Sequence, residues 1–308
     1  MEAGDFIHTA DDGAKIFVYR WWPEGEPRAV VQIAHGMAEH AARYAPLAAA
    51  LVAAGYGVVA NDHRGHGRSA KSDDDLGYFA GRDGWNLCIS DLYALNRRLA
   101  AEHPQLPRIL LGQSMGSFMA QHYFIEHGHS IAAGVLSGSD WGGGAMLLLG
   151  LGLAAVETLR LGPRGRSLPL TAISFGAFNK GIDNPRTPFD WLSRDAEEVR
   201  KYIDDARCGF LCTNRMWHDL LQGLRFIENR GNMARVPKQL PIYVLAGSED
   251  PVSNRTKRLD ALLAAYRRLG LSAVSHKFYP GGRHEMFNET NRAEVIAELI
   301  AWLDGVIG

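Results

Sequence analysis

The sequence predicts a protein of the α/β class, with a mostly parallel sheet covered by helices on both faces. Short β-branched or apolar runs alternate along the chain with longer segments of helical periodicity. One apolar run, residues 109–111, leads directly into residues 112–116, which read Gly-Gln-Ser-Met-Gly. The alternation stops at about residue 141 and resumes after about residue 231, which indicates an insertion between two parts of one sheet.

Seven runs are predicted strands, because each is short, rich in apolar or β-branched residues and bounded by turn-forming residues. They are residues 16–21, 29–34, 57–61, 108–111, 132–136, 242–246 and 274–279. Five segments have the length and the apolar period of helices. They are residues 44–54, 85–102, 115–126, 256–269 and 292–306. Parallel strands need crossover connections, which helices in these places supply.

The insertion at residues 141–231 is predicted to form a helical cap over the carboxyl edge of the sheet, between core segments 1–140 and 232–308. Its apolar run at residues 145–156 has 12 residues, too few for the roughly 20 that span a bilayer. Three interpretations of this run stay open. It lines an acyl pocket, it dips one face into a lipid interface, or it is an ordinary buried helix of the insertion.

The composition is that of an ordinary soluble globular protein. Its 308 residues are 46% hydrophobic, enough for a large core in one domain. The 33 basic and 34 acidic residues give a formal charge of −1, which disfavours nucleic acid or an anionic membrane as a partner. The start of the chain lacks the basic and apolar pattern of a secretory signal, so we expect a cytoplasmic location. The oligomeric state is not indicated.

Three cysteines, Cys88, Cys208 and Cys212, are odd in number and widely spaced, which argues against a disulfide framework and fits a reducing compartment. Cys208 and Cys212 could share a helix face as a pair of metal ligands. Because no further Cys or His follows at ligand spacing, we interpret them as small buried apolar residues. No metal or cofactor is expected.

Residues 112–116 have the pattern of a nucleophile elbow, in which a strand turns sharply into a helix. The turn strains the backbone of the central residue, Ser114, and holds its hydroxyl out at the top of the sheet. Glycines two positions before and after Ser114 leave room for this turn. The flanking predicted strand and helix make the pattern specific, and it indicates a serine hydrolase.

A serine is a poor nucleophile at neutral pH, so Ser114 needs a general base and an acid that orients the base. Asp250 follows the predicted strand 242–246, and His284 follows the predicted strand 274–279. Both lie in loops at the carboxyl ends of strands, where open α/β sheets build their sites. The order Ser, Asp, His along the chain is that expected of this fold.

Other residues compete for these roles. Glu249 is the rival acid beside Asp250, and His276, on a predicted strand, is a weaker candidate for the base. Taken alone, Asp250 is equally well a turn residue before Pro251, and His284 a solvated loop histidine. The combination with the elbow favours the triad.

Hydrolysis also needs donors for the oxyanion that develops on the carbonyl. The backbone N–H of Met115, directly after Ser114, is one candidate. The predicted strand 29–34 ends in residues 35–40, His-Gly-Met-Ala-Glu-His, where the N–H of Met37 is the second. An ordinary turn at the end of the strand is the alternative for this loop.

Residues 61–69 read Asn-Asp-His-Arg-Gly-His-Gly-Arg-Ser and follow another predicted strand. Their glycines and charges predict a tight, internally hydrogen-bonded loop. His63 and His66 are conceivable metal ligands, but no third ligand lies nearby at a recognisable spacing.

Together these residues resemble the α/β-hydrolase superfamily, and within it the monoacylglycerol lipase and lysophospholipase-like group, which sequence also groups with serine aminopeptidases. The similarity is carried by residues 35–40 with Arg43 and Tyr44, residues 62–69, 112–116 and 247–250, and His284. The motifs occur in the family's order over nearly the whole chain outside the insertion. The resemblance implies an α/β-hydrolase fold with Ser114 as nucleophile, Asp250 as acid and His284 as base. It also implies Met37 and Met115 as oxyanion donors, and no cofactor.

The function expected from these residues is hydrolysis of a carboxylic ester through an acyl-enzyme, on a small-molecule ester with a medium or long acyl chain, such as a monoacylglycerol or lysophospholipid. A general short-chain carboxylesterase is the first alternative. An aminopeptidase or amidase is another, with Glu39, Asp140 or Asp190 as candidates to hold a free amine. Acyl transfer and a catalytically inactive binding protein are less favoured, and Ser114 argues against halide or epoxide chemistry, which uses an aspartate at the elbow.

Overall fold

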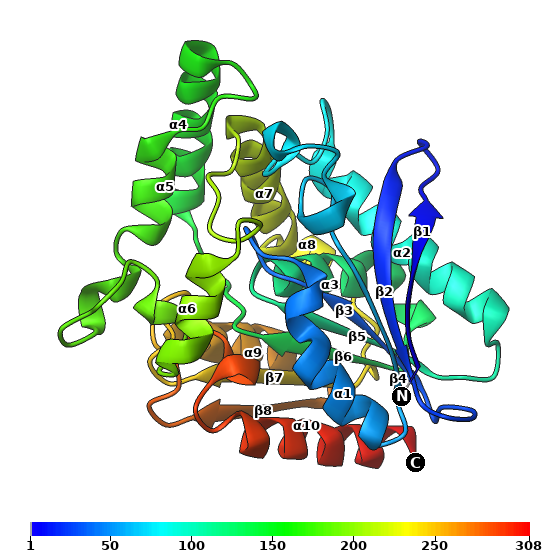
Figure 1. Cartoon of the computed structure of the whole chain (residues 1–308). Helices are drawn as coiled ribbons and strands as arrows, with labels where there is room; N and C mark the ends of the chain where they lie inside the picture. Colours follow the sequence, from blue (N-terminus) through cyan, green and yellow to red (C-terminus); the bar gives the residue numbers. More distant parts are fainter. Residues whose placement is uncertain (1) are drawn as a thin grey trace.

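The computed structural model describes residues 2–308 and contains one twisted sheet with helices on both sides (Figure 1). The strands are β1 Glu2–Thr9, β2 Lys15–Trp22, β3 Val30–Ala34, β4 Gly57–Asn61, β5 Arg108–Gln113, β6 Ala133–Ser137, β7 Ile242–Gly247 and β8 Val274–Tyr279. Their order across the sheet is β1-β2-β4-β3-β5-β6-β7-β8. From β4 to β8 all neighbours are parallel, whereas β1 and β2 pair antiparallel at one edge. The predicted, mostly parallel sheet is confirmed.

Strand β1 is the one element of the sheet that the sequence did not predict. Most of its side chains are exposed, because it is an edge strand held only by β2. An edge strand with little buried surface does not need the apolar alternation by which strands are recognised.

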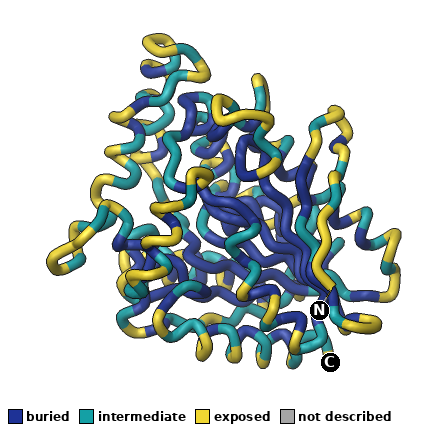
Figure 2. The backbone as a smooth tube through the Cα atoms, viewed as in Figure 1, coloured by how far each residue is buried: buried dark blue, intermediate teal, exposed yellow. Residues whose placement is uncertain are grey.

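Helices cover both faces of the sheet, as predicted. Helices α1 (Ala45–Ala53) and α10 (Arg292–Ile307) pack on one face, and α2 (Gly84–Glu102), α3 (Met115–His127) and α9 (Lys257–Arg268) pack on the other. The side chains of β5 alternate between the two cores, because successive residues of a strand point to opposite faces. The central strands are therefore buried on both sides, and Figure 2 shows them as the least exposed part of the chain.

The insertion between β6 and β7 is helical. It holds α4 Ala145–Leu161, α5 Leu168–Phe175, α6 Ala196–Asp204, α7 Asn214–Ile227 and α8 Arg230–Met233. Helix α7 packs against α2 and α3 of the core, and α4 packs against α7 (Figure 1). Helix α7 therefore connects α4 to the core. Seven 3-10 helices complete the described chain: η1 Ala41–Tyr44, η2 Gly67–Ser69, η3 Asp73–Asp75, η4 Gly128–Ser130, η5 Phe178–Gly181, η6 Asp190–Leu192 and η7 Met286–Asn288.

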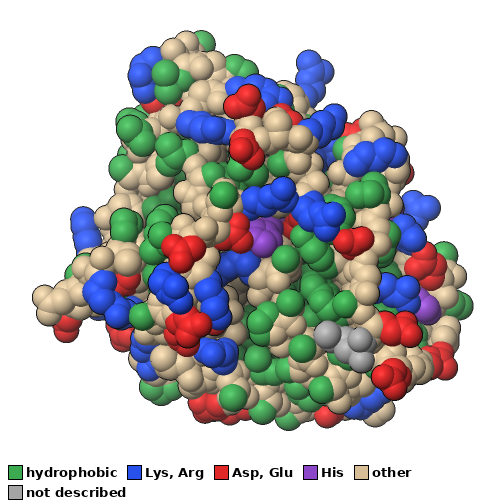
Figure 3. Space-filling model, in the orientation of Figure 1, with side chains coloured by type: hydrophobic (Ala, Val, Ile, Leu, Met, Phe, Trp, Pro, Cys, Tyr) green, Lys and Arg blue, Asp and Glu red, His purple; other side chains and the backbone are tan. Residues whose placement is uncertain are grey.

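The apolar run at residues 145–156 forms most of α4, and it is not buried on all sides. Leu147 and Ala154 are buried, but large apolar side chains on the opposite side of the helix face solvent. The exposed apolar residues of α4 and α5, here called the cap patch, are Met146, Leu148, Leu149, Val156, Leu159, Leu161, Leu168 and Ile173. Figure 3 shows apolar side chains gathered over this part of the surface. The interpretation of the run as an ordinary buried helix is therefore wrong.

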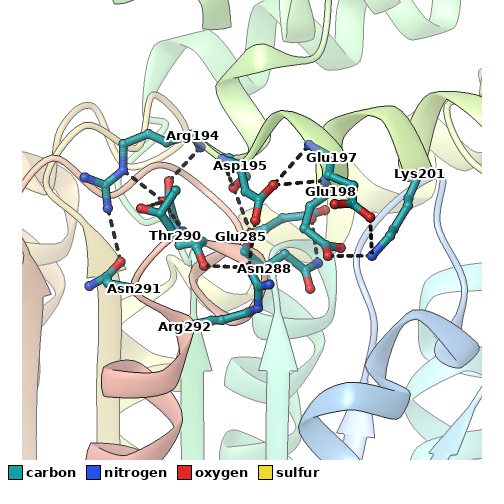
Figure 4. Close-up of polar contacts among 12 residues, drawn as sticks. Arg194, Asp195, Glu197, Glu198, Lys201, Glu285, Asn288, Thr290, Asn291 and Arg292 are labelled. Atoms are coloured by element: carbon teal, nitrogen blue, oxygen red, sulfur yellow. Dashed lines mark hydrogen bonds and ion pairs between the residues drawn. The ribbon is translucent and has the colours of Figure 1, made fainter.

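Ion pairs fasten the insertion to the end of the chain (Figure 4). Asp195 caps α6 by accepting the N–H of Glu197, and it also pairs with Arg292 at the start of α10 at 2.8 Å. Arg194 pairs with Glu289, whose side chain is fully buried, at 2.9 Å. A buried carboxylate must be paired and hydrogen-bonded to be tolerated, so this contact fixes residues 194–195 of the insertion against the core.

Within residues 2–308, none of the helices combines the length and the apolar character needed to cross a membrane. The cytoplasmic location stays a prediction of the sequence.

The two-faced core gives a direct test of packing. Leu299 of α10 is fully buried against the sheet, whereas Leu159 of α4 is 89% exposed. We expect Leu299→Ala to lower the free energy of unfolding by about 2–5 kcal/mol, because it removes transfer energy and leaves a cavity. Leu159→Ala is the matched control and should change it by no more than about 0.5 kcal/mol. Urea denaturation measures both, and equal effects would contradict the assigned burial.

Candidate active site

Ser114 lies at the junction of β5 and α3, in the sharp turn that the sequence predicts. Its backbone has φ 53° and ψ −122°, a conformation that non-glycine residues rarely adopt. A Cβ on Gly116 would lie 2.0 Å from the carbonyl oxygen of Ala34, and one on Gly112 would lie 2.2 Å from the carbonyl oxygen of Gly116. Both glycines are therefore required by close backbone contacts around the turn.

Asp250 and His284 are brought together by the loops after β7 and β8. His284 Nδ1 lies 3.0 Å from Asp250 Oδ1, and both side chains are buried. Asp250 Oδ1 also accepts the N–H of Val252 at 2.9 Å, which holds the carboxylate in place. With Nδ1 engaged by Asp250, the Nε2 atom is the ring nitrogen left for a reacting group.

The rival candidates lie elsewhere. Glu249 pairs with Arg255 at 3.1 Å, and about half of each side chain is exposed. His276 is exposed on β8. Neither residue lines the cavity that contains Ser114 and His284.

The environment of His284 acts on its pKa in two directions. Burial alone would lower it, because burial disfavours the charged ring. The Asp250 carboxylate raises it through its charge and its hydrogen bond, and the nearby charges of Glu285 and Glu39 raise it further. The sum lies above the ordinary value, so the carboxylates outweigh burial.

The loop of His284 is tied to the elbow and to the insertion. Gln113, next to Ser114, donates from Nε2 to the carbonyl of His284 at 3.1 Å. The indole ring of Trp191, from the insertion, lies 5.0 Å from the imidazole ring. The Ser114 hydroxyl itself makes no hydrogen bond with any residue in the range 2–308.

Two backbone amides beside Ser114 are unengaged. Within the described part of the chain, the N–H groups of Met37 and Met115 have no hydrogen-bond acceptor. The next amide, that of Ala38, donates to Nε2 of His66 at 3.3 Å, and His66 Nδ1 lies 2.9 Å from the carbonyl of Arg64. Burial lowers the pKa of His66 to about 4, so its ring is neutral and able to accept. The contact between Ala38 and His66 thus holds the loop that carries Met37 in place.

The predicted tight loop at residues 61–69 is confirmed. The Asp62 carboxylate accepts the N–H of Ala41 at 2.8 Å and that of Arg68 at 2.6 Å. A Cβ on Gly67 would lie 2.2 Å from this carboxylate, which explains a glycine there. His63 contacts the carbonyl of His35 at 3.2 Å through Nε2, so its ring serves the loop.

The cysteines do not lie as a pair on a helix face, because Cys208 and Cys212 belong to the loop between α6 and α7. All three cysteines are free and buried. The sequence also gave no sign that Cys208 lies near a contact between His40 Nε2 and Asp205 Oδ2, which are 2.8 Å apart. Burial is the largest of the effects that raise the pKa of Cys208.

Ser114 and His284 line one cavity of about 980 Å³ between the core and the insertion. Its walls are mostly apolar, and the insertion supplies many of them, including Met146, Leu147, Leu170, Phe175 and Trp217. At the junction of core and insertion, Asp140 and Arg258 line the cavity as an ion pair at 2.6 Å. The site therefore combines a polar reacting end with a long apolar wall.

Comparison with known proteins identifies the family. The model of the serine aminopeptidase S33 family matches residues 25–291. The chain belongs to this family. A monoacylglycerol lipase from Mycolicibacterium smegmatis is 31% identical, over 94% of this chain and 93% of its own length. A monoglyceride lipase from Mus musculus is 33% identical, over 97% of this chain and 90% of its own.

A solved structure gives the same result for the fold. A highly thermostable carboxyl esterase from Bacillus coagulans, in complex with glycerol, superposes with a TM-score of 0.90 and 28% identity, and the match covers all of both chains. The sheet and the helical insertion thus have the arrangement of an α/β hydrolase.

The balance of charges around His284 can be measured directly. We expect an NMR titration of the ring to give a pKa above the ordinary value of about 6.5 in the wild type. In Asp250→Asn the pKa should fall, because burial is then opposed only by the weaker charges of Glu285 and Glu39. Glu249→Gln is the matched control and should leave the pKa unchanged. An equal shift in both variants would contradict the assignment of Asp250 as the partner.

Proposed function

We propose that this chain hydrolyses monoacylglycerols through an acyl-enzyme formed on Ser114. The observation that carries the proposal is the cavity itself. A strained serine, a buried His-Asp pair and two unengaged amides meet at one end of a mostly apolar space of about 980 Å³. The names of its relatives, a monoacylglycerol lipase, a monoglyceride lipase and a carboxyl esterase, support ester hydrolysis.

In the first half of the reaction, Ser114 Oγ attacks the ester carbonyl while Nε2 of His284 takes the hydroxyl proton. Asp250 holds the ring through Nδ1 and stabilises its positive charge. The N–H groups of Met37 and Met115 donate to the oxyanion of the tetrahedral intermediate. When the intermediate collapses, the alcohol leaves with the proton of His284, and the acyl group stays on Ser114.

In the second half, water replaces the alcohol. His284 takes a proton from the water, whose oxygen attacks the acyl carbonyl, and the same two amides hold the second oxyanion. Collapse returns the proton to Ser114 and releases the fatty acid. No group beyond the chain's own residues and water is needed for either half.

The lining of the cavity favours a neutral head group. Among its lining residues within 2–308, Arg258 is the one Lys or Arg, and it is already paired with Asp140. A lysophospholipid carries a phosphate, which needs an available cation or several donors to leave water. The apolar wall fits a medium or long acyl chain better than the substrates of a short-chain esterase.

The aminopeptidase alternative keeps one candidate with an unengaged carboxylate oxygen. Glu39 is engaged by Arg43, and Asp190 by Thr187 and the N–H of Arg186. Asp140 pairs with Arg258 through Oδ2, whereas its buried Oδ1, in the lining of the cavity, has no hydrogen-bond partner among the described residues. Asp140 is therefore the candidate that could hold a free amine, and the preference for esters rests on the names of the relatives.

We further propose that residues 141–231 act as a cap whose cap patch contacts lipid. Helix α4 lines the cavity through Leu147 and Leu153, and Met146, Leu168 and Ile173 of the cap patch line it too. The other exposed apolar residues of α4, among them Leu148, Leu149 and Leu159, face solvent. Patches of this kind on a soluble protein mark interaction surfaces, and the proposed substrate is itself held in lipid. This contact would place the apolar wall of the cavity close to the acyl chains.

The substrate is tested with glycerol monoesters of two to sixteen carbons, beside aminoacyl amides. We expect kcat/KM to rise to eight carbons or more, and Ser114→Ala to lower kcat by at least about 10⁴-fold. A short-chain optimum would make the chain a general carboxylesterase, and activity confined to amides would make it an aminopeptidase. Wild-type esterase activity in Ser114→Ala would overturn the acyl-enzyme mechanism.

Lipid contact is tested by sedimentation with neutral phosphatidylcholine vesicles. We expect Leu149→Ser/Leu159→Ser to reduce the bound fraction several-fold, because each exposed leucine would otherwise bury apolar area worth about 1.5–3 kcal/mol. Hydrolysis of a short soluble ester should be unchanged. Ile7→Ser, at an exposed isoleucine of β1, is the control and should bind as the wild type does. Equal binding by all three proteins would contradict a role for the cap patch.

A further inference from the structure

A chain of buried charges runs beside the reacting groups. The guanidinium of Arg43 donates to Glu39, and it donates two hydrogen bonds to Glu285, at 2.8 Å and 2.7 Å. The three side chains are only 5–11% exposed. Such a bidentate contact fixes the geometry of both partners, which a single point charge would not do.

One end of this chain reaches the loop that carries the first oxyanion donor. Glu39 Oε1 accepts the N–H of Gly36 at 2.5 Å and the hydroxyl of Tyr44 at 2.8 Å. Gly36 directly precedes Met37, so the orientation of the Met37 amide depends on the place of this carboxylate. A Cβ on Gly36 would lie 2.7 Å from the same oxygen, which shows how closely the loop is packed on Glu39.

The other end reaches the general base. Glu285 directly follows His284, and its N–H donates to the carbonyl of Leu192 at 2.8 Å. Its carboxylate also accepts from Asn288 at 2.8 Å, a contact visible in Figure 4. Arg43 thus joins the loop of Met37 to that of His284, and its partner Glu285 lies 242 residues away from it in the sequence.

The charges of this chain also act on His284. The titratable groups that act on the ring are Asp250, Glu285 and Glu39, and those that also act on the guanidinium are Asp205, Tyr44, Tyr202 and Cys208. Burial keeps the two tyrosines and the thiol neutral, because it raises their pKa values. Arg43 is therefore the positive charge that offsets Glu39 and Glu285, and without it these carboxylates would raise the pKa of His284 further.

We propose that Arg43 is a positioning residue that couples the loop of the oxyanion donor Met37 to the loop of His284. The inference rests on the proposed function for its effect on rate. Arg43 touches no reacting atom, and it acts through Glu39 on one side and Glu285 on the other. Loss of the guanidinium leaves two buried carboxylates that repel each other and releases both loops.

The test compares Arg43→Met and Arg43→Lys with the wild type. We expect Arg43→Met to lower kcat about 100-fold, the size of losing one oxyanion donor, with KM changed less than about threefold. Arg43→Lys keeps the charge but loses the bidentate geometry, so its kcat should lie between that of the wild type and that of Arg43→Met. Unchanged kcat in Arg43→Met would overturn the proposal.

A second measurement, the pH dependence of kcat/KM, reports the effect of these charges on the pKa of His284. A general base works in its neutral form, so a higher pKa of His284 moves the acid limb of kcat/KM to higher pH. We expect this shift in Arg43→Met and the opposite shift in Glu285→Gln. The second variant keeps Arg43 paired with Glu39, so it leaves no buried charge unpaired and serves as the test if Arg43→Met does not fold. No shift of the limb in Glu285→Gln or Arg43→Met would overturn the coupling.

Arg64→Met is the matched control. Arg64 is also buried and bidentate, to Asp91 at 2.7 Å and 2.8 Å, but its carboxylate partners, Asp91 of α2 and Asp12 of the turn between β1 and β2, lie outside the loops of Met37 and His284. We expect this variant to lose thermal stability while the NMR pKa of His284 stays unchanged. If Arg43→Met also lost thermal stability with no change in the pKa of His284, Arg43 would have a purely structural role and the proposal would be overturned. The NMR measurement of the His284 pKa needs no turnover, so it tests the role of Arg43 separately from the reaction. Full activity in Ser114→Ala would refute the proposed function but would not decide whether Arg43 couples the loops of Met37 and His284.

Discussion

The close contact between helix α3 and strand β3 is the constraint on which the rest of the site depends. Gly116 packs so tightly on the carbonyl of Ala34 that no larger residue fits, and the chain must turn sharply at Ser114 to allow it. A backbone conformation of this kind stores about 1–3 kcal/mol, which a sheet buried on both faces can hold. The same contact sets the loop after β3, and with it Met37, beside the serine.

Buried polar groups then hold that loop in place. His66 accepts the amide of Ala38 from one side, and Glu39 accepts the amide of Gly36 from the other. Leaving such a group unpaired costs about 1–3 kcal/mol, so each contact strongly favours one arrangement of the loop. The ion pair of Arg43 belongs to the same network. Its burial separates it from surface pairs such as Arg98 with Glu102, whose side chains are both well exposed and whose attraction water screens.

The sequence predicted seven of the eight strands and the helices that flank them, and it named the residues Ser114, Asp250 and His284 whose neighbourhood the structure shows, because these depend on local patterns and on the order of motifs. It missed β1, whose exposed side chains carry no apolar alternation. It left the run at residues 145–156 open, since hydrophobicity alone does not say which side of a helix is covered. It also missed the contact of Arg43 with Glu285, because a pairing over 242 residues leaves no periodic signal.

In the proposed reaction the core supplies the reacting atoms, and the insertion supplies much of the apolar wall that would contact the acyl chain. The central claim is that an acyl group passes through Ser114. It is tested most directly by quenching the enzyme with acid during turnover of a monoacylglycerol and mapping its peptides by mass spectrometry. We expect the mass of the acyl group on the peptide that contains Ser114, and no adduct in His284→Ala treated in the same way. Rapid turnover with no adduct at Ser114, or an adduct on another residue, would contradict the mechanism.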